Sequence, residues 1–264
     1  GTLAENVPGG EVTTTLQLTG TNGLQMSRQN APVLVGDEWC ALRDLDLTNY
    51  TMTVDRGVFD TPPVPHSSGE QVIVIQRPNS LGRQVYEPGV SFGVKCLTRT
   101  GQGQLQPENA DTLTFTVNGR MWHPYPPGNF RVNGTRYGTS VRSTSLTLEW
   151  SHRDRTEQTG DIVSQDTGDI GPESGVEYEL EVLDAQSGTQ LFSSMLNQDT
   201  SWTDSGHQQT TTSTDAPWRL EARLRSHRDT YTSWKDHVHT FERYGYGFCY
   251  TDSNGNTNYG GYES

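Results

Sequence analysis

Apolar and polar residues alternate along several short segments of this chain, with the period of two that is typical of β-strands with one buried face. The clearest pair lies in the second half of the chain. Leu146, Leu148 and Trp150 alternate with polar residues, and the same pattern runs from Val176 to Val182. A polar loop with several glycines separates them. Two half-buried strands, the first of which carries a Trp, predict a small antiparallel β-sandwich.

The same pattern predicts shorter strands in both halves of the chain. A continuous apolar run at 72–75 suits a strand that is covered on both faces. No segment of the first half keeps a helical period over a helix-length stretch, so we predict an all-β fold. Further strands are expected at 12–18, 33–35, 38–42 (joined to 33–35 at Gly36-Asp37), 50–54, 90–97, 112–117, 130–132, 190–195, 218–225 and 235–242, and a polar loop at 199–217.

A break in composition falls at 124–129, where the sequence reads PYPPGN. Prolines cannot donate to a β-ladder and they stiffen the backbone, so this stretch predicts a short, semi-rigid connector. We therefore expect two β-sandwich-like domains, at residues 1–124 and 125–264.

Charge patterning predicts one strand pairing in the second domain. The polar side of 177–181 carries Glu177, Glu179 and Glu181, and the polar side of 219–225 carries arginines. Opposite charges across a ladder stabilise it, so these two segments are expected to be neighbours in one sheet.

The overall charge argues against several classes of partner. The chain carries 19 Lys and Arg against 32 Asp and Glu, a formal net charge of -13, whereas a phosphate-binding surface needs concentrated positive charge. Nucleic acid is therefore not expected as a partner, and the short apolar runs predict no membrane insertion. Cys40, Cys96 and Cys249 lie far apart, which indicates buried free thiols in a reducing compartment rather than disulfides or a zinc site.

Two short motifs could carry chemistry but have simpler explanations. His237 and His239 lie on one face of a strand as a possible metal pair, but no third ligand is evident, and an exposed strand face explains them equally well. The sequence HRDR at 152–155 resembles a kinase catalytic loop without the Asn and the phosphate loop that a kinase needs. Its residues are expected to pin their own loop or to contact a neighbouring subunit.

The remaining motifs predict neither a cofactor nor an enzyme. Residues 252–256 (DSNGN) resemble part of a calcium loop, but Asn254-Gly255 is better explained as a hairpin turn. No GxSxG elbow, phosphate loop or HExxH motif is present, so we expect no catalytic residues, no cofactor and no metal.

Several stretches taken together resemble the tail-hub or tip-attachment proteins of long-tailed bacteriophages, the group typified by the lambda tail tip protein J. The first is 53–69 (TVDRGVFDTPPVPHSSG), followed by 97–103 and the connector at 124–129. Trp150, His152, Arg153, Asp154, Arg155 and Gln158 resemble the start of that family's fibronectin type III-like module, and 168–173 (GDIGPE) its continuation. The Gly/Tyr-rich end, 244–247 and 259–261, resembles the ends of such proteins.

The resemblance implies a hub-associated β domain at 1–124 and a fibronectin type III-like domain with a Gly/Tyr-rich tail at 125–264. It implies a structural part of the phage tail tip or baseplate that is assembled in the bacterial cytoplasm and located in the virion. Its partners would be other tail proteins, a host receptor or tail fibres, and further copies of itself. The usual assembly of such copies is a trimer. The size and the missing initiator Met suggest the C-terminal portion of a longer chain or a shortened relative.

The resemblance also gives interface candidates in the first domain. In Asp55-Arg56-Gly57, the glycine can adopt a backbone angle that other residues rarely adopt. Asp60 and His66 bracket a proline-rich excursion and are expected to tie it back, which is a role in folding. The alternative functions are a stand-alone adhesin or glycan-binding module and a cell-wall hydrolase. The adhesin would stack sugars on Tyr244, Tyr246, Tyr250 and Tyr259.

Overall fold

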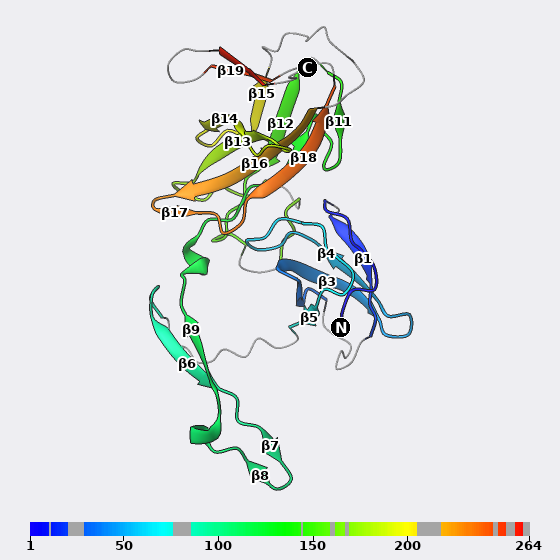
Figure 1. Cartoon of the computed structure of the whole chain (residues 1–264), viewed down its shortest axis with the longest axis vertical. Helices are drawn as coiled ribbons and strands as arrows, with labels where there is room; N and C mark the ends of the chain where they lie inside the picture. The colour runs from blue at the N-terminus through cyan, green and yellow to red at the C-terminus, as the bar shows by residue number, and fades with distance from the viewer. Residues whose placement is uncertain are drawn as a thin grey trace. The chain divides into compact units, whose positions relative to one another are not determined.

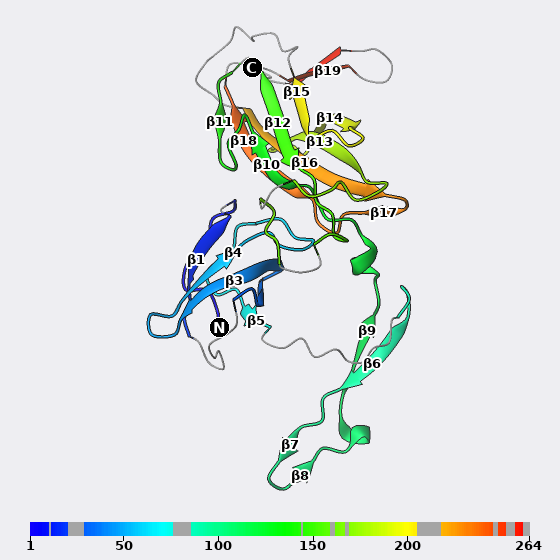
Figure 2. The same cartoon turned by 180° about the vertical axis from the view of Figure 1, so that it is seen from behind.

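The computed structural model describes residues 1–10, 12–20, 29–75, 86–143, 145–158, 162–166, 169–204, 218–244, 248–251 and 257–260. These residues form two compact units, one made of Gly1–Arg77 with Pro124–Ser264 and the other of Pro78–His123. Strands dominate both units, which confirms the predicted all-β class (Figure 1; Figure 2 shows the view from behind). No helix in the described ranges is long and apolar enough to cross a membrane.

The N-terminal part of the first unit is an antiparallel sheet of five strands in the order β1-β4-β3-β2-β5. Alternate residues of these strands, such as Leu16, Leu42 and Val54, are buried, and Leu3 and Val7 of the N-terminal segment pack with them in one core. Gly36 has a φ of 53° in the predicted turn between β2 and β3. The strands are β1 (Thr13–Gln17), β2 (Pro32–Val35), β3 (Glu38–Asp46), β4 (Thr51–Asp55) and β5 (Val72–Val74).

The expectation of a strand covered on both faces at 72–75 was wrong. β5 is an edge strand that pairs only with β2, and the side chain of Ile73 is 41% exposed. Val72 and Val74 pack with the core on one face of the sheet, whereas Ile73 lies on the opposite face, because successive side chains of a strand point to opposite faces.

The C-terminal part of the first unit is a two-sheet sandwich of the fibronectin type III-like kind. A sheet in the order β10-β12-β15 faces a larger sheet in the order β11-β18-β16-β13-β14, and β17 pairs with the end of β16. Trp150 and Tyr178 meet edge to face in the core between the sheets, with ring centroids 6.2 Å apart. The strands are β10 (Gly128–Val132), β11 (Ser140–Val141), β12 (Leu146–Ser151), β13 (Glu177–Asp184), β14 (Gln190–Met195), β15 (Ser201–Asp204), β16 (Trp218–Arg228), β17 (Tyr231–Thr232) and β18 (His237–Arg243), while β19 (Phe248–Thr251) pairs with β20 (Thr257–Gly260).

The expected loop at 199–217 is partly wrong because Ser201–Asp204 forms strand β15. Trp202 packs against Phe192, with ring centroids 4.7 Å apart. This contact anchors a segment whose composition is otherwise polar. Residues 205–217 lie outside the described part of the chain.

The pairing predicted from charge is confirmed. Strands β13 and β16 are antiparallel neighbours, with Glu179 opposite Arg225 and Glu181 opposite Arg223. Arg225 bridges two of the carboxylates, with N–O distances of 3.5 Å to Glu179 and 2.7 Å to Glu181. The acidic and basic outer rows therefore match across the ladder, as the sequence indicates.

The second unit is built around a two-stranded antiparallel ribbon of β6 (Ser91–Lys95) and β9 (Thr112–Thr116). It also contains a short pair, β7 (Arg99–Thr100) and β8 (Gly103–Gln104), and the 3-10 turns η1 (Pro107–Asn109) and η2 (Arg120–Trp122). The expected division into 1–124 and 125–264 differs from this arrangement, because 78–123 is an insertion between two halves of one unit. The two halves keep separate apolar cores, as two domains would.

The connector and the cysteines show how burial compares with the expectations. Pro124, Pro126 and Pro127 are buried, so the segment 124–129, predicted as a semi-rigid connector, packs within the first unit. A proline has no N–H group, so it can be buried without needing a hydrogen-bond acceptor. Of the cysteines expected to be buried, Cys40 is buried but Cys96 is exposed, and the side chain of Cys249 lies outside the description.

Candidate functional site: a buried joint

Glu38, the first residue of β3, accepts hydrogen bonds from several groups deep in the N-terminal part. Its side chain is fully buried, and its Oε2 lies 2.6 Å from Nη2 of Arg56 and 2.9 Å from Nε2 of His66. The backbone N–H groups of Gly57 and Val64 donate to it over 3.0 and 2.9 Å. Burial alone would raise the pKa of Glu38, but the hydrogen bonds from His66 and Arg56 outweigh it and lower this pKa. Glu38 is therefore a charged anchor.

Arg56 and His66 connect this anchor to the surrounding chain. Arg56, 1% exposed, donates from Nη1 to the carbonyl oxygen of Pro8 over 2.5 Å and from Nη2 to that of Val64. His66 lies between two carboxylates, with Nδ1 2.8 Å from Glu70. Burial opposes a charge on His66, but its bonds to Glu38 and Glu70 outweigh it and raise its pKa. The proline-rich excursion is thus tied back by His66 through these two glutamates.

Gly57 turns the chain out of β4 towards the C-terminal sandwich. Its φ is 64°, and a Cβ there would lie 2.7 Å from Cγ of Gln165 and 2.8 Å from Cδ of Pro63. Only glycine adopts this conformation without strain, so Gly57 permits the close approach of the two parts. The approach continues next to it, where Val58 forms a β-bridge with Ser164.

Arg153 holds the two parts together from the sandwich side. It is 4% exposed, and it donates from Nη1 to the carbonyl oxygen of Gly57 over 3.3 Å and from Nη2 to Oε1 of Gln158 over 3.2 Å. Its guanidinium lies 5.1 Å from the ring centroid of Tyr125, which is a cation–π contact. Burial lowers the pKa of Arg153 to about 10, while the charge of the buried Asp60 opposes this change.

Tyr137 makes a second connection between the two parts. Its hydroxyl lies 3.1 Å from the carbonyl oxygen of Pro63 and 2.9 Å from Nε2 of His237. Nδ1 of His237 faces the carbonyl oxygen of Pro127 at 2.9 Å, so the ring proton sits on Nδ1 and Nε2 is an acceptor. The single hydroxyl hydrogen of Tyr137 is therefore shared between two acceptors, the carbonyl oxygen of Pro63 and Nε2 of His237. Burial lowers the pKa of His237 to about 4. We call this set of contacts, centred on Glu38, Arg56, His66, Gly57, Arg153, Tyr137 and His237, the joint.

His239 lies beside the joint in an aromatic enclosure and not on an exposed strand face, so that expectation was wrong. It is 1% exposed and stacks on Tyr137, with ring centroids 5.1 Å apart. Neither of its ring nitrogens has a hydrogen-bond partner. Burial lowers its pKa to about 4. Within the described residues, no group of three His, Cys, Asp or Glu could hold a metal ion.

The loop after β12 is fixed mainly by its own residues. Asp154 accepts bonds from the backbone N–H and the hydroxyl of Thr156 over 2.7 and 2.6 Å. Arg155 forms a 2.9 Å ion pair with Glu173. His152 stacks on Tyr178, and its Nδ1 lies 2.6 Å from the hydroxyl of that residue. The sequence HRDR therefore holds a loop in place, and its Arg153 also reaches Gly57.

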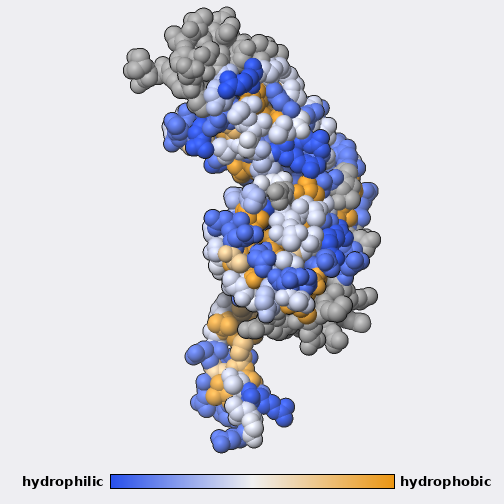
Figure 3. Space-filling view, turned by 90° about the vertical axis from the view of Figure 1, so that its right-hand side faces the viewer, coloured by the Kyte–Doolittle hydropathy of each residue, from blue (hydrophilic) through white to orange (hydrophobic). Residues whose placement is uncertain are grey.

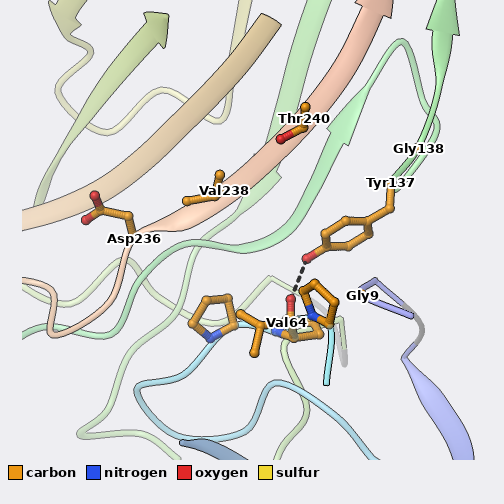
Figure 4. Close-up of a pocket in the computed structure, with 10 residues that line it drawn as sticks. Gly9, Val64, Tyr137, Gly138, Asp236, Val238 and Thr240 are labelled. Atoms are coloured by element: carbon orange, nitrogen blue, oxygen red, sulfur yellow. Dashed lines mark hydrogen bonds between the residues drawn. The ribbon is translucent and has the colours of Figure 1, made fainter. Parts of the chain in front are cut away.

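A cavity of about 590 Å³ lies next to the joint, between the proline-rich excursion and β18 (Figure 4). Val64, Val238 and prolines form apolar walls, and Tyr137 closes one side through its bond to Pro63. The charged residue of the lining is Asp236, whose carboxylate is already 3.0 Å from Arg225. Within the described lining, Asp236 is therefore held in an ion pair, and the hydroxyl of Tyr137 lies between Pro63 and His237.

The tyrosines expected to stack on sugars are only partly described. Tyr244 donates to a carboxylate oxygen of Glu242 over 2.9 Å, and the guanidinium of Arg142 lies 4.0 Å from its ring centroid. One face of this ring is therefore already occupied. Tyr246, the side chains of Tyr250 and Tyr259, and the expected turn or calcium loop at 252–256 lie outside the description.

Sequence reasoning missed several residues of the joint. Glu38 shares its alternation with Cys40 and Leu42, which are buried, so a carboxylate at an inward position was the signal that could have found it. Tyr137 and Gln165 lie in polar loops with no such signal. Gln165 nevertheless accepts a 2.8 Å bond from the backbone N–H of Asn129.

Comparison with known proteins adds little. No protein-family model matches the chain, and no curated protein matches it. Among solved structures, the chain is similar to the crystal structure of the FN1–FN3 domains of chicken CNTN1, at 9% sequence identity and a TM-score of 0.28. The match covers 94% of this chain and 66% of that chain, so this chain spans less than two thirds of its length. A similarity this distant carries no argument, and the description of the sandwich rests on its own strand order.

Proposed function

We propose that this protein is a structural component of a bacteriophage tail tip, where it joins other tail proteins and contributes to host attachment. The observation that carries the proposal is the meeting of two separate stretches of the family resemblance. Gly57 belongs to the run at 53–69 and Arg153 to the start of the fibronectin type III-like module. The two are joined by a buried hydrogen bond across 96 positions of the chain. Individually weak motifs support the resemblance better when their residues share one site.

The chemistry of the joint suits a mechanical role. The carboxylate of Glu38 is saturated by donors and its pKa is lowered, so it stays ionised at neutral pH instead of shuttling protons. Arg153 and Tyr137 hold the sandwich against the N-terminal sheet from two directions. Two β modules fixed in this way move as one body, as a protein that passes force between neighbours in a particle requires. Assembly would take place in the bacterial cytoplasm.

The direct test is to look for the chain in purified virions. We expect peptides from both β modules in the virion, at a polypeptide mass of 29.3 kDa or above, and gold-labelled antibody at the tail end of the particle. A capsid protein labelled in the same preparation is the control for position. Absence from virions, together with abundant protein in the infected-cell supernatant, would overturn the proposal.

A further inference from the structure

The ribbon of β6 and β9 separates its residues by polarity into two complete faces. Cross-strand partners share a face, and residues alternate between the faces along each strand. Phe92 is paired with Phe115 and Val94 with Leu113, while Val90 lies beside Val117 at the end of the ribbon. These six side chains form one apolar face. The opposite face consists of Ser91, Gly93, Lys95, Thr112, Thr114 and Thr116.

The apolar face is open to solvent. Leu113 is 52% exposed, Phe115 49% and Val90 40%, although Tyr86 stacks on Phe92 at a centroid distance of 5.4 Å. Apolar residues are visible at the surface of this unit, at the bottom of Figure 3. A ribbon of two strands is at most marginally stable in water unless something packs on its apolar face. A contiguous apolar face of this kind marks a site of association.

We infer that this face is a contact surface for the same ribbon in another copy of the chain. Its three rungs have nearly the same side chains on both strands, Val-Phe-Val on one and Leu-Phe-Val on the other. Contact between identical copies about a two-fold axis requires a surface that is complementary to itself. A face of aliphatic and aromatic side chains meets this requirement, because it presents no like charges to its own copy. The two faces would then form one shared apolar layer between two polar ones.

The distribution of charge favours another copy of the chain as the partner of this face. Residues 78–123 carry four Lys and Arg against three Asp and Glu, a formal charge of +1, which leaves -14 for the rest of the chain. Two copies that meet through other surfaces would bring strongly acidic bodies together. The apolar face carries no charged residue, so it is where copies can meet with the least repulsion.

The inference deepens the proposed function by naming the surface through which copies of this component meet. The test is sedimentation velocity of the full chain from about 1 to 100 μM, a range that detects micromolar association. Two variants place the same charge on adjacent residues of opposite faces, L113E on the apolar face and T114E on the polar face. Wild type and T114E are expected to assemble into two or more copies. L113E should weaken the assembly roughly a hundredfold or more, because it buries an unpaired carboxylate.

A milder variant, L113T, keeps a strand-forming residue and guards against loss of the ribbon itself; it should weaken the assembly about tenfold. A wild-type protein that stays monomeric at all concentrations would overturn the inference. The apolar face would then be covered by another part of its own chain or by a different partner, such as a phosphatidylcholine vesicle. The inference would also be overturned if L113E and T114E assembled equally well, because the copies would then associate through a surface other than this face. Association that depends on Leu113, in a protein absent from virions, would overturn the tail-tip role and support the ribbon contact.

Discussion

Replacing Glu38 with Gln tests whether the joint depends on a buried charge. The substitution keeps the size of the side chain, removes the charge and replaces one acceptor oxygen with an NH₂ donor. Oε1 of Glu38 accepts from Nε of Arg56 and from the backbone of Gly57, whereas Oε2 accepts from Nη2 of Arg56 and from the backbone of Val64. In either orientation of the amide, its NH₂ group therefore meets an Arg56 N–H and a backbone N–H.

The expected loss can be worked out from burial. The side chains of Glu38 and Arg56 are 0% and 1% exposed, so Gln leaves Arg56 as a buried charge without its partner. Breaking a buried pair by removing one partner typically costs about 3–5 kcal/mol. The free energy of unfolding of a whole domain is on the order of 5–15 kcal/mol, so this loss is large. It corresponds to a fall in melting temperature of about 10 °C.

Urea denaturation followed by tryptophan fluorescence measures this loss. Glu149→Gln is the matched control, because Glu149 is exposed on β12, and it should change the free energy of unfolding by less than about 0.5 kcal/mol. A Glu38→Gln protein within about 1 kcal/mol of wild type would refute the reasoning. It would mean that the N–H groups around Glu38 find other acceptors.

Three further predictions concern the joint and its surroundings. Gly57→Ala should lower the free energy of unfolding by about 2 kcal/mol or more, because a φ of 64° is strained for alanine and the added Cβ meets Gln165. Thermal denaturation measures this loss, and an unchanged melting temperature would contradict it. Arg153→Lys should lower the free energy of unfolding in urea by about 1–3 kcal/mol, because an ammonium cannot reach both Gly57 and Gln158. A Lys variant as stable as wild type would show that the two guanidinium bonds do not contribute to stability. Burial lowers the pKa of His239 to about 4 from an ordinary 6.5, so the unfolded chain binds more protons between these values and stability falls as the pH drops from 6.5 towards 4. His239→Leu should make the loss of stability between pH 7 and pH 4 smaller by about 3 kcal/mol. Urea titrations at the two pH values measure this difference. An equal loss in wild type and the variant would show that His239 is not responsible.

The strands could be predicted from the sequence because each one shows its buried face locally. Leu146, Leu148 and Trp150 alternate with polar residues, and all three are buried in the sandwich. The pairing of β13 with β16 could also be predicted, since Glu179 and Arg225 carry complementary charges on the outer face of the sheet. Both inferences need only the period of a strand and the sign of a charge.

The inserted unit could not be predicted from such patterns. Phe92 and Leu113 alternate with polar residues in the same way whether their face is covered by the same chain or by another molecule. The prolines of 124–129 indicate a connector by composition, yet they are buried, and Tyr125 beside them contacts Arg153, which only the folded chain brings close. The joint links residues far apart in sequence. The backbone angle of Gly57 and the anchoring roles of His66 and Arg153 could be predicted, and the inward-facing Glu38 was a further local signal.

The spacing of the joint along the chain also sets an order of events during synthesis. Tyr137 bonds to His237 across 100 positions, and Arg153 to Gly57 across 96, whereas Ser91 and Thr116 of the ribbon are separated by 25. Contacts between near residues form sooner than contacts between distant ones. The ribbon can thus be complete on the ribosome while the sandwich is still being translated, and nascent chains on one messenger could meet before either has closed its joint.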